Sequence, residues 1–156
     1  MISVVMSFQA IEVFANAVIG RRATKNIVVK RKGADRNLTP SEAERNLSTE
    51  EKIAQALPTI VGIPSPRGNR VWQAFKMLKV GRDATVHLKS HDAYTRNNVD
   101  RESLFFYYLN HDVRKFPAAA IKVISHFWPN GLPRWLQHAK EMSDRDSRFG
   151  TGATAL

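Results

Sequence analysis

Cysteine is absent from this chain of 156 residues. Its absence excludes a disulfide framework, a zinc site built on thiolates and a thiol nucleophile. The chain also lacks the glycine-rich patterns Gly-x-Gly-x-x-Gly and Gly-x4-Gly-Lys-Ser/Thr, so the usual loops that hold nucleotide phosphates are missing and we expect no cofactor. A single domain of this size buries roughly 70% of its unfolded surface, which is enough to fold without a metal. A chain without cysteine fits a reducing compartment, and we expect a cytoplasmic protein.

Long apolar runs are lacking as well. A membrane span needs ~18 consecutive apolar residues, and the nearest candidate, residues 1–19, is interrupted by Ser7, Gln9, Glu12 and Asn16. This stretch has neither a basic start nor an Ala-x-Ala exit, so it does not look like a signal peptide. Its apolar residues recur at steps of three and four, which predicts a core helix over residues 2–20, ending at Gly20, and no membrane partner.

Acidic residues are few. Asp and Glu total 14 against 24 Lys and Arg, so the formal charge is +10. Such a surface favours a polyanion, most often a nucleic acid, although many domains are basic for solubility alone.

The segment 21–47 holds a cluster of these basic residues: Arg21, Arg22, Lys25, Lys30, Arg31, Lys32 and Arg36. It shows little periodicity, and we interpret it as a long basic connection after the first helix, with a possible short extended piece at 27–29. Thr39 and Pro40 favour the start of a short helix. Connections of this length are uncommon in a compact domain unless they are functional or flexible.

Helical spacing dominates the rest of the chain. Ser48 and Glu51 form a capping box before a helix that Pro58 weakens or ends, and Gly and Pro mark a turn-rich connection over 62–68. Further helices are predicted over 69–91, 100–110, 112–128 and 132–142. We therefore expect an all-α fold, an antiparallel bundle of four to six helices, with a domain over 1–142 and a disordered tail over 143–156.

Arg82 and His87 are the residues with the most pointed chemistry. A histidine moves protons near neutral pH, and an arginine grips a phosphate through two hydrogen bonds. Together they suit attack of an RNA 2′-hydroxyl on the neighbouring phosphorus, with His87 transferring the proton and Arg82 neutralising the extra negative charge. No metal is required for this reaction.

The spacing of the two residues is weak support when it is taken alone. Five residues of helix rotate a side chain by about 140°, so the pair cannot share one face of a straight helix. Either the helix distorts near Arg82, or the two side chains border one groove, or a second subunit completes the site. The alternative is an exposed arginine and a histidine at a helix end, which is the commoner origin of such a spacing.

The surrounding sequence adds a family resemblance. Residues 75–89, with Arg82, polar Asp83 and His87 after four intervening positions, resemble the signature helix of the HEPN superfamily. Residues 7–16, where bulky apolar side chains frame Glu12 and Asn16, look like the first helix of that superfamily. The resemblance covers roughly residues 1–130, and the basic segment 21–47 has no counterpart in it.

The resemblance implies a helical bundle that dimerises, and a metal-independent endoribonuclease of toxin–antitoxin, defence or RNA-processing systems. It implies catalytic roles for Arg82 and His87, a supporting role for Asp83, and one composite site made by two copies. An antitoxin or a nucleotidyltransferase-like protein is then a possible partner. Segment 21–47 is either a substrate arm or an unrelated loop.

Other polar residues have two interpretations each. Glu12 and Asn16, four apart on one helix face, either orient the Arg82 helix or fill polar gaps and face solvent. Lys79, Lys89 and Arg96 either bind RNA phosphates or are solvated surface charges. His91, four residues after His87, has the spacing of a metal ligand pair but lacks an evident third ligand, so we expect no metal site.

The sequence therefore leaves three hypotheses for function. The first is the endoribonuclease, and the second is a non-catalytic HEPN-like module that binds RNA or a protein. The third is the neutralised half of a toxin–antitoxin pair, or a regulatory domain cut from a larger enzyme.

Overall fold

The protein is mostly helical, with one small antiparallel sheet. The computed structural model describes residues 2–86, 112, 115–128 and 130–149. Its elements follow the chain in this order: α1 (Ile2–Arg22), β1 (Ile27–Arg31), β2 (Ala34–Leu38), α2 (Pro40–Asn46), α3 (Thr49–Glu51), the π-helical turn η1 (Lys52–Ala56), α4 (Leu57–Val61), α5 (Arg70–Val86), α7 (Lys115–His126) and α8 (Arg134–Phe149). The predicted helix over 100–110 lies outside the described residues.

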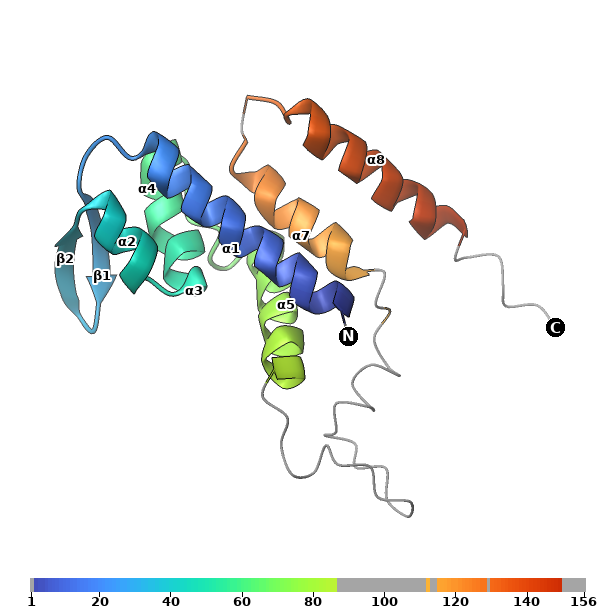
Figure 1. The fold of residues 1–156 in the computed structure, drawn as a ribbon, viewed down its shortest axis with the longest axis horizontal. Helices are drawn as coiled ribbons and strands as arrows, with labels where there is room; N and C mark the ends of the chain where they lie inside the picture. The colour runs from blue at the N-terminus through green and yellow to red at the C-terminus, as the bar shows by residue number, and fades with distance from the viewer. Residues whose placement is uncertain (1, 87–111, 113–114, 129, 150–156) are drawn as a thin grey trace, which may run out of the picture.

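Helix α1 is the centre of the fold. It contacts α7, α5, α2, α3 and α4, while α8 packs on α7 (Figure 1). Its buried side chains are Val4, Phe8, Ile11, Ala15, Val18 and Ile19, the three- and four-residue steps that the sequence predicts. The core helix is confirmed, but the predicted stop at Gly20 is wrong because the helix continues through Arg22.

By length and composition alone, α1 is apolar enough to cross a membrane, over Ser3–Arg22. The expectation that no stretch reaches that length is therefore wrong by this criterion. Inside the fold, 44% of the apolar window is buried, and the core helix of a soluble protein passes the same test. Ile11, Ala15 and Ile19 are among the apolar residues of α1 that are buried in the core.

The basic segment 21–47 is not a connection without structure. Strands β1 and β2 pair antiparallel, with Ile27 opposite Leu38 and Arg31 opposite Ala34. The turn between them has two residues, Lys32 and Gly33, both with positive φ (51° and 81°), as in the type I′ turns that suit tight hairpins. The all-α prediction lacked this hairpin because its strands are short and its charged side chains hide the alternation of buried Ile27 and Val29.

Both predicted helix starts after the hairpin are confirmed. Thr39 caps α2 with Pro40 at its first position, and its backbone N–H donates to Glu42 in a capping box. Ser48 caps α3, and the Glu51 carboxylate accepts from the Ser48 backbone N–H and hydroxyl at 2.8 Å each. These boxes satisfy N–H groups that a helix end leaves without partners.

Pro58 changes the hydrogen bonding of the helix without ending it. It has no N–H to offer the Ala54 carbonyl four residues back, and the chain widens there into η1, where the Leu57 N–H donates to the Lys52 carbonyl. The Ser65 hydroxyl donates to the Ala54 carbonyl at 2.7 Å. A side chain from the following connection thus replaces the missing backbone donor, and the helix continues as α4.

Helix α8 is longer than expected. It runs from Arg134 to Phe149, so the predicted helix end at residue 142 is wrong, and residues 143–149, expected in a disordered tail, belong to a helix. Residues 150–156 lie outside the described residues. The helix packs on α7, and its Leu136 is 1% exposed and belongs to the core, which the polar sequence around it concealed.

Candidate functional site

Helix α5 carries Arg82 to the surface of the bundle. The Asn69 side chain caps its first turn by accepting from the N–H groups of Val71 and Trp72 at 2.8 and 3.1 Å. Phe75 and Leu78 are buried on its inner side. The helix continues past Arg82 to Val86, so the described part of this helix does not favour the first of the three alternatives, a distortion near Arg82.

The guanidinium of Arg82 rests on an aromatic ring. Its Cζ lies 4.5 Å from the centroid of Phe8, a cation–π distance. The Phe8 ring is 6.0 Å from that of Phe75, which is 5.2 Å from that of Trp72. The core thus supplies a fixed platform under a charge whose side chain is 29% exposed.

Asp83 holds the same guanidinium from the side. Its Oδ1 is 2.9 Å from Arg82 Nη1, and its Oδ2 is 3.4 Å from Lys79 Nζ. Lys79 in turn lies 3.8 Å from a carboxylate oxygen of Glu50 in α3, and Lys76 lies 4.0 Å from the same oxygen. The Arg82 end of α5 therefore carries alternating charges, in which Asp83 bridges two cations that a phosphate would also attract.

Glu51, the neighbour of Glu50 in α3, contacts the hairpin. Glu51 Oε1 accepts from Arg31 Nε of β1 at 3.0 Å. Burial acts to raise the pKa of the Glu51 carboxyl, but the hydrogen bonds from Ser48 and the charge of Arg31 outweigh it and bring the pKa below its ordinary value. The two adjacent glutamates thus face cations of two different elements, β1 and α5.

Asn16 and Glu12 act on a lysine that the sequence analysis missed. The Lys52 ammonium donates to Asn16 Oδ1 at 2.8 Å and to the Glu44 carbonyl at 2.7 Å, and Lys52 is only 3% exposed. Burial lowers the pKa of Lys52, while the charges of Glu12 and Glu44 act to raise it. Asn16 therefore fills a polar gap at η1, the second of its two interpretations. The signal in the sequence was a lysine directly before the largely apolar run that begins with Ile53 and Ala54.

Three predicted site residues, His87, Lys89 and Arg96, lie outside the described residues, and so does His91. Of the predicted set, the structure brings together Arg82, Asp83 and Lys79, and it places Glu12 and Asn16 at Lys52 instead. Within the described ranges, no three His, Asp or Glu side chains gather in a way that would hold a metal ion.

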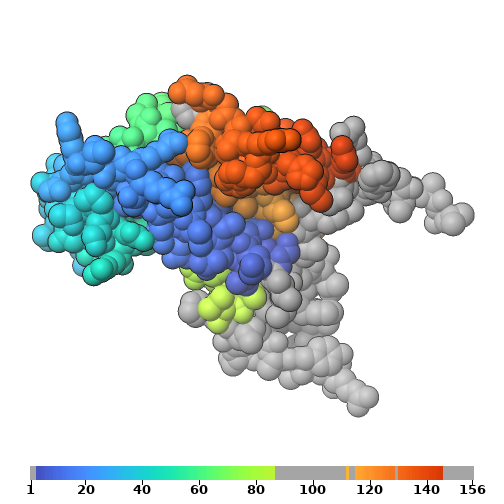
Figure 2. All heavy atoms as spheres, turned by 45° about the horizontal axis from the view of Figure 1, so that its top comes forward, coloured from blue at the N-terminus to red at the C-terminus, as the bar shows by residue number. Residues whose placement is uncertain are grey.

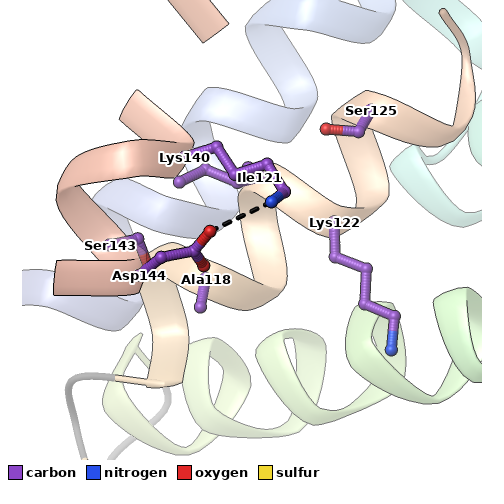
Figure 3. Close-up of a pocket in the computed structure, with 7 residues that line it drawn as sticks. All are labelled: Ala118, Ile121, Lys122, Ser125, Lys140, Ser143 and Asp144. Carbon is purple, nitrogen blue, oxygen red and sulfur yellow. Dashed lines mark hydrogen bonds and ion pairs between the residues drawn. The ribbon is translucent and has the colours of Figure 1, made fainter. Parts of the chain in front are cut away.

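A hollow of about 300 Å³ lies between α7 and α8, away from the predicted residues (Figure 3). Its wall consists of Ala118, Ile121, Lys122, Ser125, Lys140, Ser143 and Asp144. The wall is mainly apolar, and Lys140 and Asp144 form an ion pair of 3.0 Å at its edge. Since this hollow contains none of the Arg82 cluster, it is a separate feature of the α7–α8 contact.

Comparison of the chain with protein-family models, curated proteins and solved structures finds no match.

Proposed function

We propose that the protein is a metal-independent endoribonuclease of the HEPN type, in a toxin or defence system of the cytoplasm. The observation that carries this proposal is the arrangement of Arg82: a permanent cation fixed on Phe8, beside Lys79 and Asp83, five residues before His87. A guanidinium held in place loses little freedom when a phosphate binds, which is the requirement for stabilising charge in a transition state.

The reaction follows from these groups. The 2′-hydroxyl of the RNA gives its proton to an imidazole, and its oxygen forms a bond to the neighbouring phosphorus. The bond from phosphorus to the 5′-oxygen breaks, and that oxygen takes a proton from a second imidazole. The products are a 2′,3′-cyclic phosphate and a 5′-hydroxyl. Arg82 stays paired with Asp83 through Nη1, and its other N–H groups bind a phosphoryl oxygen and balance the negative charge that develops there.

Two proton-transferring groups are needed, whereas each chain brings one His87. We therefore place the site across a homodimer, with one His87 from each copy. Met6 and Val13 of α1, seven residues apart on one side of the helix, are 62% and 57% exposed. Apolar surface of this kind is suited to contact with a second copy.

The test is cleavage of a mixed RNA pool in excess chelator, with mass determination of the new ends. Wild type should give cyclic phosphate ends, while Arg82→Ala and His87→Ala should each lose activity by at least about a hundredfold. Arg134→Ala is the matched control, because it removes one exposed charge from another helix, α8. Equal cleavage by wild type and both site variants would refute the assignment.

A second candidate is a non-catalytic RNA- or protein-binding module. It is favoured by the ion pair between Arg82 and Asp83, which occupies the guanidinium as a structural contact would. Binding of RNA without product, unchanged by His87→Ala, would establish this module and exclude the nuclease.

A further inference from the structure

The positive charge of the chain is concentrated in the hairpin and the residues before it. Residues 21–38 contain seven Lys or Arg and one Asp, so this stretch carries six of the ten net positive charges. All seven basic side chains are exposed. Figure 2 shows this part of the surface at one end of the molecule, away from α8. Such a local concentration, more than the total charge, is typical of a polyanion-binding surface.

The hairpin is held firmly against the helices. Ile27 is 2% exposed and Val29 is 1% exposed. The Gln55 side chain of η1 pairs with both backbone groups of Lys30: its Oε1 accepts from the Lys30 N–H at 2.7 Å, and its Nε2 donates to the Lys30 carbonyl at 3.2 Å. This amide closes the free edge of β1 as a neighbouring strand would. A cationic surface fixed in this way needs little ordering when a partner binds.

The turn of the hairpin holds a lysine in a backbone conformation that glycine and asparagine adopt more readily. Lys32 has a φ of 51°, and it is the one non-glycine residue with positive φ in the described part of the chain. Asn and Gly are the usual residues at such a position. A lysine there costs stability and places a cation at the tip, and backbone strain of this kind is often retained where a site needs it.

Most of these cations form no ion pair with a residue that the structure describes. Arg31 is paired with Glu51, and Arg22 lies over the ring of Trp128 at 4.6 Å. The other five have no ion pair with any described residue: Arg21, Lys25, Lys30, Lys32 and Arg36. By contrast, Lys76 and Lys79 on α5 share Glu50. The hairpin therefore offers free cations, whereas those of α5 are partly neutralised.

We propose that β1, β2 and the end of α1 form a preformed nucleic-acid-binding arm that holds the phosphate backbone of RNA. Its position relative to Arg82 fits this role, because Glu51 and Glu50 of α3 contact the hairpin and α5 respectively. A membrane-surface arm would need a broad apolar face, and Val28 is the one large apolar side chain exposed on the strands. Delivery of RNA to Arg82 rests on the proposed function, whereas binding by the arm is measurable without cleavage.

The test measures the affinity for a labelled 20-nucleotide single-stranded RNA by fluorescence anisotropy, over a range of salt concentrations. The arm variant is Lys32→Asn with Arg36→Gln. Lys32→Asn suits the turn, so the melting temperature should stay the same or rise, which separates loss of binding from loss of fold. The control variant, Arg134→Gln with Arg145→Gln on α8, removes the same charge from exposed positions.

If the arm contacts two phosphates through these side chains, the slope of log K against log salt should fall in magnitude by about 1.4, since each contact with single strands contributes ~0.7. The control should keep the slope of the wild type. Equal slopes in the arm variant and the wild type would overturn the proposal, and so would an equal fall in both variants. Binding to phosphatidylserine vesicles that exceeds binding to RNA, and that the arm variant loses, would also overturn it.

The two proposals fail in different ways. Arm-dependent binding with no cleavage would leave the arm established and the nuclease refuted. Cleavage that depends on Arg82 and His87, with the same RNA affinity and KM in the arm variant, would leave the nuclease established and the arm refuted.

Discussion

The guanidinium of Arg82 lies over the ring of Phe8, with 4.5 Å between Cζ and the ring centroid. This contact joins a residue near the end of α5 to one in the second turn of α1, 74 positions earlier in the chain. Phe8 is 2% exposed, so its ring cannot turn away from the charge. The position of the proposed catalytic cation is thus set by the packing of the core.

Phe8→Leu should impair cleavage more than it impairs folding. Leucine keeps most of the apolar volume, so the free energy of unfolding should fall by about 1 kcal/mol, but the cation–π contact is lost. Phe75→Leu is the control, because Phe75 packs on Phe8 without a contact to Arg82 in the described structure. At a temperature well below the melting temperatures of both variants, the single-turnover rate of Phe8→Leu should be lower than that of Phe75→Leu. Equal rates would show that the ring does not position Arg82.

Asp83→Asn should separate binding from chemistry. Removing the carboxylate frees Arg82 and Lys79 for phosphates, so RNA affinity should rise by a few-fold. Arg82 also loses its lateral support, so kcat should fall about tenfold, as expected when a group is no longer held in place. The free energy of unfolding should change by less than about 1 kcal/mol, since the pair is partly exposed. A loss of affinity at unchanged kcat would contradict this role.

Lys52→Met tests the buried lysine at η1. The change leaves Asn16 Oδ1 and the Glu44 carbonyl without their donor, and the free energy of unfolding should fall by about 1–3 kcal/mol. Leu136→Met in α8 is the comparison, because it changes the packing of a buried side chain and removes no hydrogen bond. Chemical denaturation at neutral pH measures both variants, and a stability equal to that of the wild type would show that the polar contacts contribute nothing.

Lys52 also makes stability depend on pH. Its pKa in the folded protein lies below the ordinary 10.5, so in the interval between the two values the unfolded chain binds more protons. Stability therefore gains a contribution that rises with pH through that interval. The difference in unfolding free energy between wild type and Lys52→Met should change in favour of the wild type as the pH approaches 10.5. A difference that is constant over this range would contradict the lowered pKa.

Ser65→Ala tests the replacement of a backbone donor. It removes the hydroxyl that satisfies the Ala54 carbonyl, and the free energy of unfolding should fall by about 1–2 kcal/mol. In a Pro58→Ala background the backbone supplies an N–H of its own, so the same change should cost less by at least about 0.5 kcal/mol. Thermal unfolding of the four proteins in this cycle measures the coupling, and additive effects would exclude it.

Local patterns in the sequence account for much of the fold. The steps of three and four in residues 2–20 predicted α1, and the Thr39 and Ser48 signatures predicted two helix starts that the structure confirms. These features were predictable because each depends on neighbours within one or two turns. The hairpin was not, because its two short strands are stabilised by burial of Ile27 and Val29 and by Gln55, 25 positions away from Lys30. The length of α8 was underestimated since its polar residues hid the burial of Leu136.

For the candidate site, the sequence by itself determined which residues the proposed chemistry uses: an arginine and a histidine that suit phosphate charge and proton transfer, on a chain with a net charge of +10. Only the tertiary structure decided the surroundings. It placed Arg82 on Phe8 and beside Asp83. It also paired Asn16 with Lys52 and folded part of the basic segment into a β-hairpin. The reason is physical: spacing fixes which side chains share a helix face, whereas packing of distant segments fixes what each of them touches.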